Sequence, residues 1–184
     1  GAGAPPPPAP AAPRWWGEEC GYGLLGPAVT PPLGVPEGDG GRLEAMRIDA
    51  GWPAMGAEIT EQTIPGELGP LVVEVVSFTK GCYVGQEVIV RVLHRGHGRV
   101  ARKLVGLTIE GDRVPSAGAT VSASDREVGT VTSATWSPAL DKAIALGYVH
   151  RDFVEPGTEL TIDGAAARVV VLPFVPKTES GAGL

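Results

Sequence analysis

The sequence predicts an α+β protein in which a short helix-containing segment is followed by an antiparallel β-barrel of about six strands. Three observations predict this fold. Residues 42–50 have the spacing of a short helix, β-prone runs recur from Arg99 onward, and glycines lie between or near these runs. Short strands separated by turn residues at this spacing are typical of all-β barrels and sandwiches.

Six short runs supply the predicted strands of the barrel. They are residues 103–109, 120–123, 127–136, 143–149, 159–162 and 166–171. We expect the barrel strands to bury eight apolar side chains: Leu104, Leu107, Val121, Val131, Ile144, Leu146, Leu160 and Val170. The intervening segments 114–119 and 154–157 are rich in turn formers, so they are expected to be connections rather than sites.

The part before the barrel has mixed signals. Residues 42–50 place Leu43, Met46 and Ala50 on one helical face, and Gly51 follows as a C-cap candidate. Residues 71–76 fit a strand or a buried turn, and residues 83–92 fit a helix or a strand equally well. Residues 21–26 fit one short strand, which cannot bury itself alone.

Composition divides the chain further. Ten of the 18 prolines precede residue 37, and residues 1–13 carry almost no side chain able to form a core before the first charge at Arg14. We expect a disordered Pro/Ala-rich tail at 1–13, a partial first domain at 14–98, the barrel domain at 99–176 and a flexible tail at 177–184.

Charge and cysteine content exclude several classes of protein. The 184 residues hold 15 Lys+Arg and 21 Asp+Glu, a net charge of -6 that argues against bulk nucleic-acid binding. Two cysteines cannot form a disulfide scaffold or, without histidines, a four-ligand zinc site, and Cys82 with His94 and His97 does not match a zinc-finger spacing. Without an apolar stretch of ~20 residues or a secretory signal pattern, we expect a cytoplasmic protein with no membrane partner.

The strongest local charge lies at residues 77–103. Six basic residues there oppose the single acid Glu87, namely Lys80, Arg91, Arg95, Arg99, Arg102 and Lys103. This pattern fits a solvated face. It equally fits a pocket for a polycarboxylate or a phosphate, because guanidinium groups match those anions in geometry and charge.

Cys82 lies inside this basic segment, between Lys80 and Gly85. A lone cysteine is often a small buried hydrophobe. Nearby cations and a following helix N-terminus would instead favour the thiolate, which is the reactive form. Cys82 is therefore the candidate catalytic residue, and Cys20 has no comparable surroundings.

The stretch from Lys80 to Glu87 reads K-G-C-Y-V-G-Q-E, and it resembles the K-G-C-Y-x-G-Q-E signature of the YgfZ-type folate-binding proteins. These belong to the superfamily of the glycine-cleavage T-protein, an aminomethyltransferase. Residues 47–51 resemble the family's R-I-E-A-G with Asp49 in place of Glu, and residues 63–67 resemble the segment between the two motifs. The resemblance covers about residues 42–175.

The resemblance implies a remnant of the folate-binding T-protein-like domain followed by the barrel, with an N-terminal half missing from this chain. It implies a tetrahydrofolate-binding accessory protein for iron–sulfur cluster assembly or repair, with cluster enzymes or assembly factors as partners. The alternative is a folate-dependent aminomethyltransferase, and a third possibility is a barrel interaction module. The implied folate-binding residues are Arg47, Lys80, Tyr83, Gln86, Glu87, Arg91 and Arg95.

Two kinds of contact are expected with folate. Arg47, Arg91 and Arg95 are expected near its glutamate tail, and Tyr83 or Gln86 nearer its pterin ring, because cations hold carboxylates whereas aromatic and amide groups stack on and hydrogen-bond the ring.

Overall fold

The computed structural model describes residues 11–16, 19–24, 33–77, 79–90 and 100–175. The part before the barrel holds strands β1 (Ala11–Trp16) and β2 (Glu19–Leu24), helices α1 (Gly40–Asp49), α2 (Val72–Val75) and α3 (Gln86–Val90), and the 3-10 helix η1 (Pro65–Leu71). The barrel strands are β3 (Arg102–Ile109), β4 (Thr120–Ala123), β5 (Arg126–Ser137), β6 (Lys142–His150), β7 (Glu159–Ile162) and β8 (Ala165–Val170), with the 3-10 helix η3 (Arg151–Phe153) after β6.

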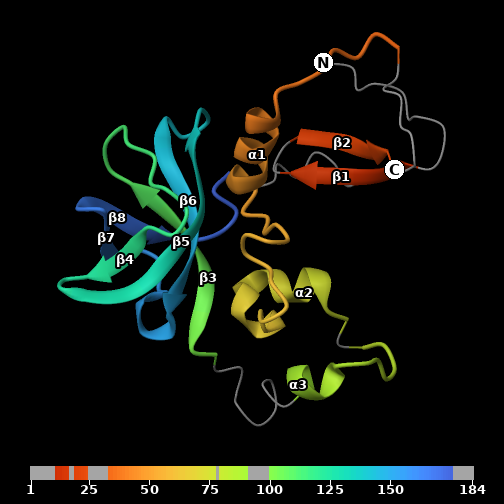
Figure 1. Ribbon diagram of the computed structural model, residues 1–184. Helices are drawn as coiled ribbons and strands as arrows, with labels where there is room; N and C mark the ends of the chain where they lie inside the picture. The colour runs from red at the N-terminus through yellow and green to blue at the C-terminus, as the bar shows by residue number, and fades with distance from the viewer. Residues whose placement is uncertain (1–10, 17–18, 25–32, 78, 91–99, 176–184) are drawn as a thin grey trace.

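Six antiparallel strands close into a barrel in the order β3-β6-β5-β4-β7-β8 (Figure 1). Pairing of β3 with β8 closes the ring, with Gly106 opposite Val170 and Ile109 opposite Ala167. The α+β class and the six-stranded barrel are confirmed. Segments 114–119 and 154–157 lie outside the strands, as their turn residues predict.

Strand β6 is buried on both faces, and this explains its nearly continuous apolar sequence. Ala143, Ala145 and Val149 face the barrel interior. Ile144, Leu146 and Tyr148 lie in a second cluster outside the barrel, together with Ile48 and Leu68 from the preceding segment. A strand covered on both faces loses the polar alternation of a half-exposed strand. Seven of the eight predicted core residues are buried, and Val170 is partly buried against the second cluster.

Helix α1 begins after Asp39, whose side chain accepts a hydrogen bond from the Gly41 backbone N–H at 3.0 Å. It ends before Gly51, which has a φ of 65° that favours glycine. On the helical face predicted for Leu43, Met46 and Ala50, Leu43 is 53% exposed and the other two residues are half-buried, whereas Arg47 and Ile48 are buried. An arginine therefore faces the barrel together with an apolar residue.

Residues 71–76 form neither a strand nor a buried turn. Leu71 ends η1 and Val72–Val75 form α2, so the β-branched composition is overridden by the turn that Pro65 and Pro70 begin. The helical alternative holds for residues 86–90, where α3 follows Gly85 at a φ of 86°.

Strands β1 and β2 form an antiparallel pair in which Ala11 lies opposite Leu24 and Trp16 opposite Glu19. The predicted strand at 21–26 therefore begins earlier and has a partner. Residues 11–13 of the predicted tail belong to β1, and residues 1–10 lie outside the described part. Within the described ranges, no helix has the length and apolar character needed to cross a bilayer.

Residues 171–175, here called the strap, follow β8 and return to α1. The backbone N–H groups of Phe174 and Val175 both donate to the Asp49 carbonyl, at 3.0 and 3.3 Å. Leu172 and Phe174 pack in the second cluster, and both lie against Gly106, where an added Cβ would meet the Leu172 Cδ2 at 2.7 Å. The strap and helix α1 are thereby fixed to the same outer face of the barrel.

Candidate functional site

The residues of the Lys80–Glu87 motif lie together on the loop before α3 and on the first turn of that helix. The Lys80 ammonium sits over the Tyr83 ring, 4.6 Å from its centroid. The Tyr83 backbone N–H donates to the Gln86 Oε1 at 3.3 Å, and the Gln86 N–H donates back to the Tyr83 carbonyl at 3.3 Å. The loop is thus a compact turn with a cation and an aromatic ring on its surface.

Cys82 is an exposed free thiol on this turn. Glu87 is exposed in the first turn of α3, where an acidic side chain suits the positive end of a helix. The accessible position of the sulfur meets one requirement for a reactive cysteine, since a buried thiol cannot meet its reaction partner.

Arg47 lies apart from this loop, on α1, with η1 and α2 between α1 and α3 (Figure 1). Its guanidinium donates to the Glu44 carboxylate, the Trp52 carbonyl, the Glu58 carboxylate and the Ser133 hydroxyl. Its Nε, Nη1 and Nη2 atoms together carry five N–H groups, and these five hydrogen bonds use all of them. A folate carboxylate would therefore have to displace an intramolecular partner to bind here.

The Arg47 ion pairs shape the charges around them. Burial opposes the charged form of Arg47, but the Glu44 hydrogen bond and the Glu58 and Glu44 charges outweigh it, so the pKa of Arg47 lies above its ordinary value. The hydrogen bond from Arg47 lowers the pKa of Glu44 despite partial burial of that carboxyl. Arg47 therefore stays a cation inside the protein.

Glu58 is the buried partner of Arg47, at 1% exposure. Its Oε2 accepts from Arg47 Nη1 at 3.1 Å and from the Ala54 N–H at 2.8 Å, and its Oε1 accepts from the Thr132 and Ser133 hydroxyls, each at 2.6 Å. Four donors satisfy a carboxylate that would otherwise be costly to bury. The sequence offered no signal for Glu58, since an isolated acid in a turn-rich segment is usually solvated.

A β-bulge in β5 makes this arrangement possible. The register with β6 shifts between Val131, opposite Gly147, and Ser133, opposite Leu146, which leaves Thr132 as the extra residue. Neighbouring residues of a regular strand point to opposite faces. The bulge re-aims the backbone so that both hydroxyls reach the same Glu58 oxygen.

A second polar cluster joins η1 to the barrel. Arg102 Nε and Nη2 donate to the two carboxylate oxygens of Glu67 at 3.2 and 3.3 Å, and its guanidinium lies 4.5 Å from the centre of the Tyr148 ring. The Tyr148 hydroxyl donates to the Glu58 carbonyl at 3.0 Å. Burial and the Glu67 charge raise the pKa of Tyr148, so its hydroxyl stays a donor.

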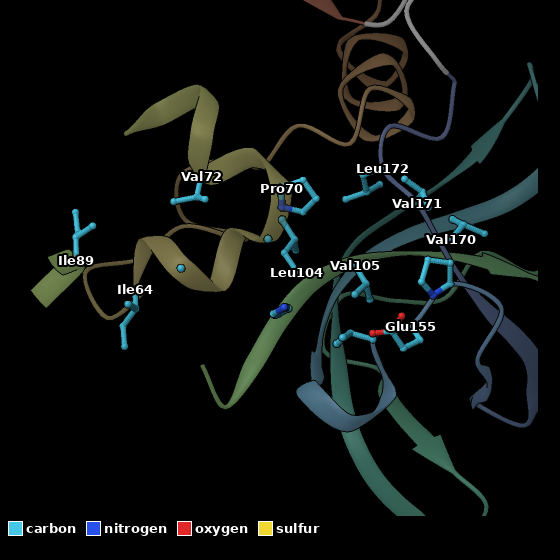
Figure 2. A pocket seen from close by; sticks show the side chains of 15 residues that line it. Ile64, Pro70, Val72, Ile89, Leu104, Val105, Glu155, Val170, Val171 and Leu172 are labelled. Carbon is cyan, nitrogen blue, oxygen red and sulfur yellow. The ribbon is translucent and has the colours of Figure 1, made fainter. Parts of the chain in front are cut away.

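A groove of about 420 Å³ lies between η1, α2 and α3 on one side and the barrel on the other (Figure 2). Ile64, Val72 and Ile89 line the first side, and Val105, Val170 and Pro156 are among the barrel residues opposite. Lys103 and Glu155 are its charged lining residues. Sequence reasoning missed this groove, because its walls come from segments that are far apart in the chain.

The remaining predicted residues are not placed. Arg91 and Arg95 lie in segment 91–99, outside the described residues. In the described part of the chain, no three His, Cys, Asp or Glu side chains gather where they could hold a metal ion. The structure thus brings together Lys80, Cys82, Tyr83, Gln86 and Glu87, and places Arg47 elsewhere.

Residues 102–176 match the family model described as the glycine cleavage T-protein C-terminal barrel domain, and this range coincides with β3 through the strap. The barrel is similar to the C-terminal barrel domain of T-proteins. A solved structure agrees: the glycine cleavage system aminomethyltransferase T from Bartonella henselae superposes with a TM-score of 0.61 and 27% identity, covering 73% of this chain and 38% of that one.

Relatives of T-protein type extend the similarity beyond the barrel. The aminomethyltransferase of Thermosynechococcus vestitus is 34% identical over 170 residues, which cover 90% of this chain and 43% of that protein. The aminomethyltransferase of Halothermothrix orenii is 32% identical over 145 residues, covering 77% of this chain and 39% of that protein. The chain spans about two fifths of the length of these curated relatives and is similar to T-protein superfamily members over most of its own length.

These names support the T-protein-like superfamily, which the motif resemblance implied. They favour the aminomethyltransferase alternative over the accessory role that we placed first. The narrower YgfZ-type assignment rests on the Lys80–Glu87 motif alone.

Proposed function

We propose that this chain forms the C-terminal part of a tetrahydrofolate-binding, T-protein-type aminomethyltransferase. The observation that carries the proposal is the T-protein barrel at residues 102–176, in a chain whose similarity to aminomethyltransferases also includes residues before the barrel. Folate is the one-carbon acceptor in this chemistry. The chain's own residues would bind and orient it, and the rest of the cavity would come from the N-terminal part that the relatives possess.

The motif turn is the proposed folate-binding element of this chain. The residues present fit the cofactor: tetrahydrofolate has a flat ring system and an anionic tail, and the turn offers the Tyr83 ring, the Gln86 amide and the Lys80 ammonium within a few residues. Tyr83 and Gln86 would lie on the ring side, and Lys80 would attract the carboxylates. We propose that Arg91 and Arg95 lie near the glutamate tail of folate. Glu87 is proposed to lie beside the motif turn.

Arg47 takes a different proposed role from direct contact with folate. Its five hydrogen bonds and its buried pair with Glu58 fix α1 and residues 52–58 against β5. We infer that it positions the segment before the barrel, and that a contact with the folate tail would require it to give up one of these bonds.

The accessory role in iron–sulfur cluster assembly or repair is the second candidate, and the exposure of Cys82 favours it. One thiolate supplies one of the four protein ligands that a cluster usually has. Cys82 would therefore serve transfer or thiol exchange with a partner rather than storage of a cluster by this chain alone.

A tetrahydrofolate titration tests the shared part of both candidates. The chain is titrated alone and after co-expression with the N-terminal part of the Thermosynechococcus vestitus aminomethyltransferase, and binding is followed calorimetrically. We expect binding by the combined protein, weakened roughly tenfold in Lys80→Ala and left unchanged in Lys142→Ala, whose exposed partner is Glu110 on the barrel. Equal binding by both variants would remove the motif turn from the site.

Turnover separates the two candidates. Formation of a one-carbon-loaded folate from an aminomethyl donor, unaffected by Cys82→Ser, supports the transferase. Absence of turnover, together with loss of cluster-enzyme activity in a deletion strain complemented with Cys82→Ser, supports the accessory role. In both assays Cys20→Ser is the matched control, and we expect it to be nearly silent.

A further inference from the structure

Helix α1 carries a buried arginine that is covered from the solvent side by an acid of the same helix. Glu44 and Arg47 lie three positions apart, so they share one helix face. Arg47 Nε donates to Glu44 Oε2 at 2.8 Å, and Arg47 Nη2 donates to Glu44 Oε1, which is the two-point geometry of a guanidinium with a carboxylate. The Glu44 side chain is 51% exposed, whereas that of Arg47 is 7% exposed. Glu44 is therefore the partner of the guanidinium that faces water.

The other three hydrogen bonds of Arg47 hold its guanidinium in place without Glu44. Nη1 donates to the Trp52 carbonyl and to Glu58 Oε2, and Nη2 gives its second N–H to Ser133 Oγ at 2.8 Å. Glu58 and Ser133 are both buried, and Ser133 belongs to a barrel strand, so neither is free to leave. If Glu44 moved away, the Nε–Nη2 edge would keep its orientation and would point at the space that Glu44 had left.

An uncovered Nε–Nη2 edge would be unfavourable. Two N–H groups of a charged side chain would lose their acceptor at a position that is almost fully buried. A small carboxylate presents the same two oxygens as Glu44, so it can restore both hydrogen bonds. The Arg47 hydrogen bond lowers the pKa of Glu44, so at neutral pH Glu44 competes for this edge as a carboxylate.

We propose that the Nε–Nη2 edge of Arg47 is a carboxylate-binding site, which the Glu44 side chain occupies and yields to an external carboxylate. Glu44 is thus an internal competitor that sets the affinity of the site. As an account of folate binding the proposal rests on the proposed function, because the folate tail carries carboxylates of this class. The site itself is defined by Arg47 and its partners, and its test needs neither folate nor an N-terminal part.

The test is an acetate titration of the whole chain. Acetate carries one carboxylate and is small enough to enter the space left by a truncated Glu44 side chain. Binding is followed by NMR of the arginine Nε–H signals at pH 7, with chloride keeping the ionic strength constant. We expect Glu44→Ala to bind acetate with a Kd roughly tenfold lower than the wild type, because the internal competitor is absent. The wild type should show the same shift of the Arg47 Nε signal at correspondingly higher acetate concentrations.

The matched control is Glu159→Ala, which removes the acid of the exposed Arg168–Glu159 pair at 2.9 Å. Arg168 is 59% exposed, so water satisfies its guanidinium, and this variant should bind acetate no more tightly than the wild type. A second control is Arg47→Lys in the Glu44→Ala background. It keeps a positive charge on α1 but loses the planar fork, so the gain in acetate affinity should disappear. Thermal unfolding shows whether this variant folds, and if it does not, the Arg47 Nε signal of Glu44→Ala decides alone.

Equal acetate affinity of Glu44→Ala and the wild type would overturn the proposal. A gain of the same size in Glu159→Ala, or a gain that persists in the folded Arg47→Lys variant, would also overturn it. Acetate-dependent shifts that leave the Arg47 Nε signal unchanged would place binding elsewhere, with the same consequence. Acetate binding at Arg47 in a chain that binds no tetrahydrofolate, even with the N-terminal part, would uphold the carboxylate site while contradicting the proposed function.

Discussion

Arg47 Nη1 donates to Glu58 Oε2 at 3.1 Å in a pair whose side chains are 7% and 0% exposed. This pair joins helix α1 to the turn that precedes η1, and the bulge of β5 supplies two hydroxyls to the same carboxylate. The pair thus connects the segment before the barrel to the barrel wall. Its buried position makes it sensitive to the loss of either partner.

Arg47→Ala should lower the free energy of unfolding by about 3–5 kcal/mol, because it leaves the Glu58 charge buried and unpaired. Urea unfolding of the whole chain measures this change. Arg168→Ala is the control, since its pair with Glu159 at 2.9 Å is exposed and should contribute about 0–1 kcal/mol. Similar losses in the two variants would show that the Arg47 pair is not a principal contact.

Glu58→Gln should lower the free energy of unfolding less in an Arg47→Met background than in the wild type. In that background the buried charge and its partner are both absent. A double-mutant cycle by urea unfolding measures this coupling, which we expect at about 1–3 kcal/mol. Additive losses would contradict a direct interaction between the two side chains.

Asp49→Asn should stabilise the protein at neutral pH. Burial raises the pKa of Asp49, an effect that the Ser137 side chain partly offsets, and its Oδ1 is buried without a hydrogen-bond partner. The folded state therefore binds the proton more tightly than the unfolded state. The contribution of the Asp49 carboxyl to the free energy of unfolding is therefore fully present below its unfolded pKa of about 3.8. That contribution is lost as the pH rises through the raised pKa of the folded state.

The advantage of Asp49→Asn should accordingly shrink as pH falls toward acid. Thermal unfolding at pH 7 and at successively lower pH measures it. Glu127→Gln, at an exposed residue of β5, is the control and should show no such trend. A stability gain for Asp49→Asn that is independent of pH would exclude the carboxyl charge as its cause.

Gly129→Ala should destabilise the barrel by about 1–3 kcal/mol or more, because the added Cβ would lie 2.3 Å from the Tyr148 carbonyl oxygen on β6. Backbone atoms of a paired strand cannot move aside without breaking the register. Gly81→Ala, where no atom lies within 4 Å of the new Cβ, should be within about 0.5 kcal/mol of wild type. Unfolding midpoints in urea compare the two variants.

In a Cys20→Ser background, Cys82 should alkylate in the folded protein at least as fast as in urea, since its sulfur is exposed. The reaction is followed by mass spectrometry at several pH values. Cys82→Ser should leave the urea midpoint unchanged, because no packing is lost. Strong protection of the thiol in the folded chain would contradict the position of the motif turn.

The barrel could be predicted closely because its signals are local. The runs 120–123 and 159–162 coincide with β4 and β7, since turn residues bound each strand and its alternation is regular. The motif turn was found for a similar reason: its residues are adjacent in the chain. The spacing of the apolar residues also predicted the helical segment at 42–50 to within two residues at its start.

Features that join distant segments could not be predicted. Glu58 accepts hydrogen bonds from Thr132 and Ser133 only because a bulge turns both hydroxyls of β5 to the same side. The residue types at 131–133 do not predict that shift in register. The burial of Arg47 on α1 could not be predicted either, because periodicity treats an arginine as a surface residue, whereas its partners make its burial favourable. Residues 71–76 were wrongly predicted as a strand or a buried turn because β-propensity considers a segment in isolation. The preceding Pro70 begins a helical turn that continues into α2.

The bonds from Phe174 and Val175 to the Asp49 carbonyl bring the entrance and the exit of the segment 49–175 to one place. A polypeptide that enters through α1 and leaves after the strap does so from the same side of the barrel. Domains fused on either side would then be neighbours without any linker that crosses the molecule. For the same reason, joining these two points and opening a loop such as 138–141 should yield a permuted chain with the same barrel, because the cut falls at a turn and the new junction spans only a short gap.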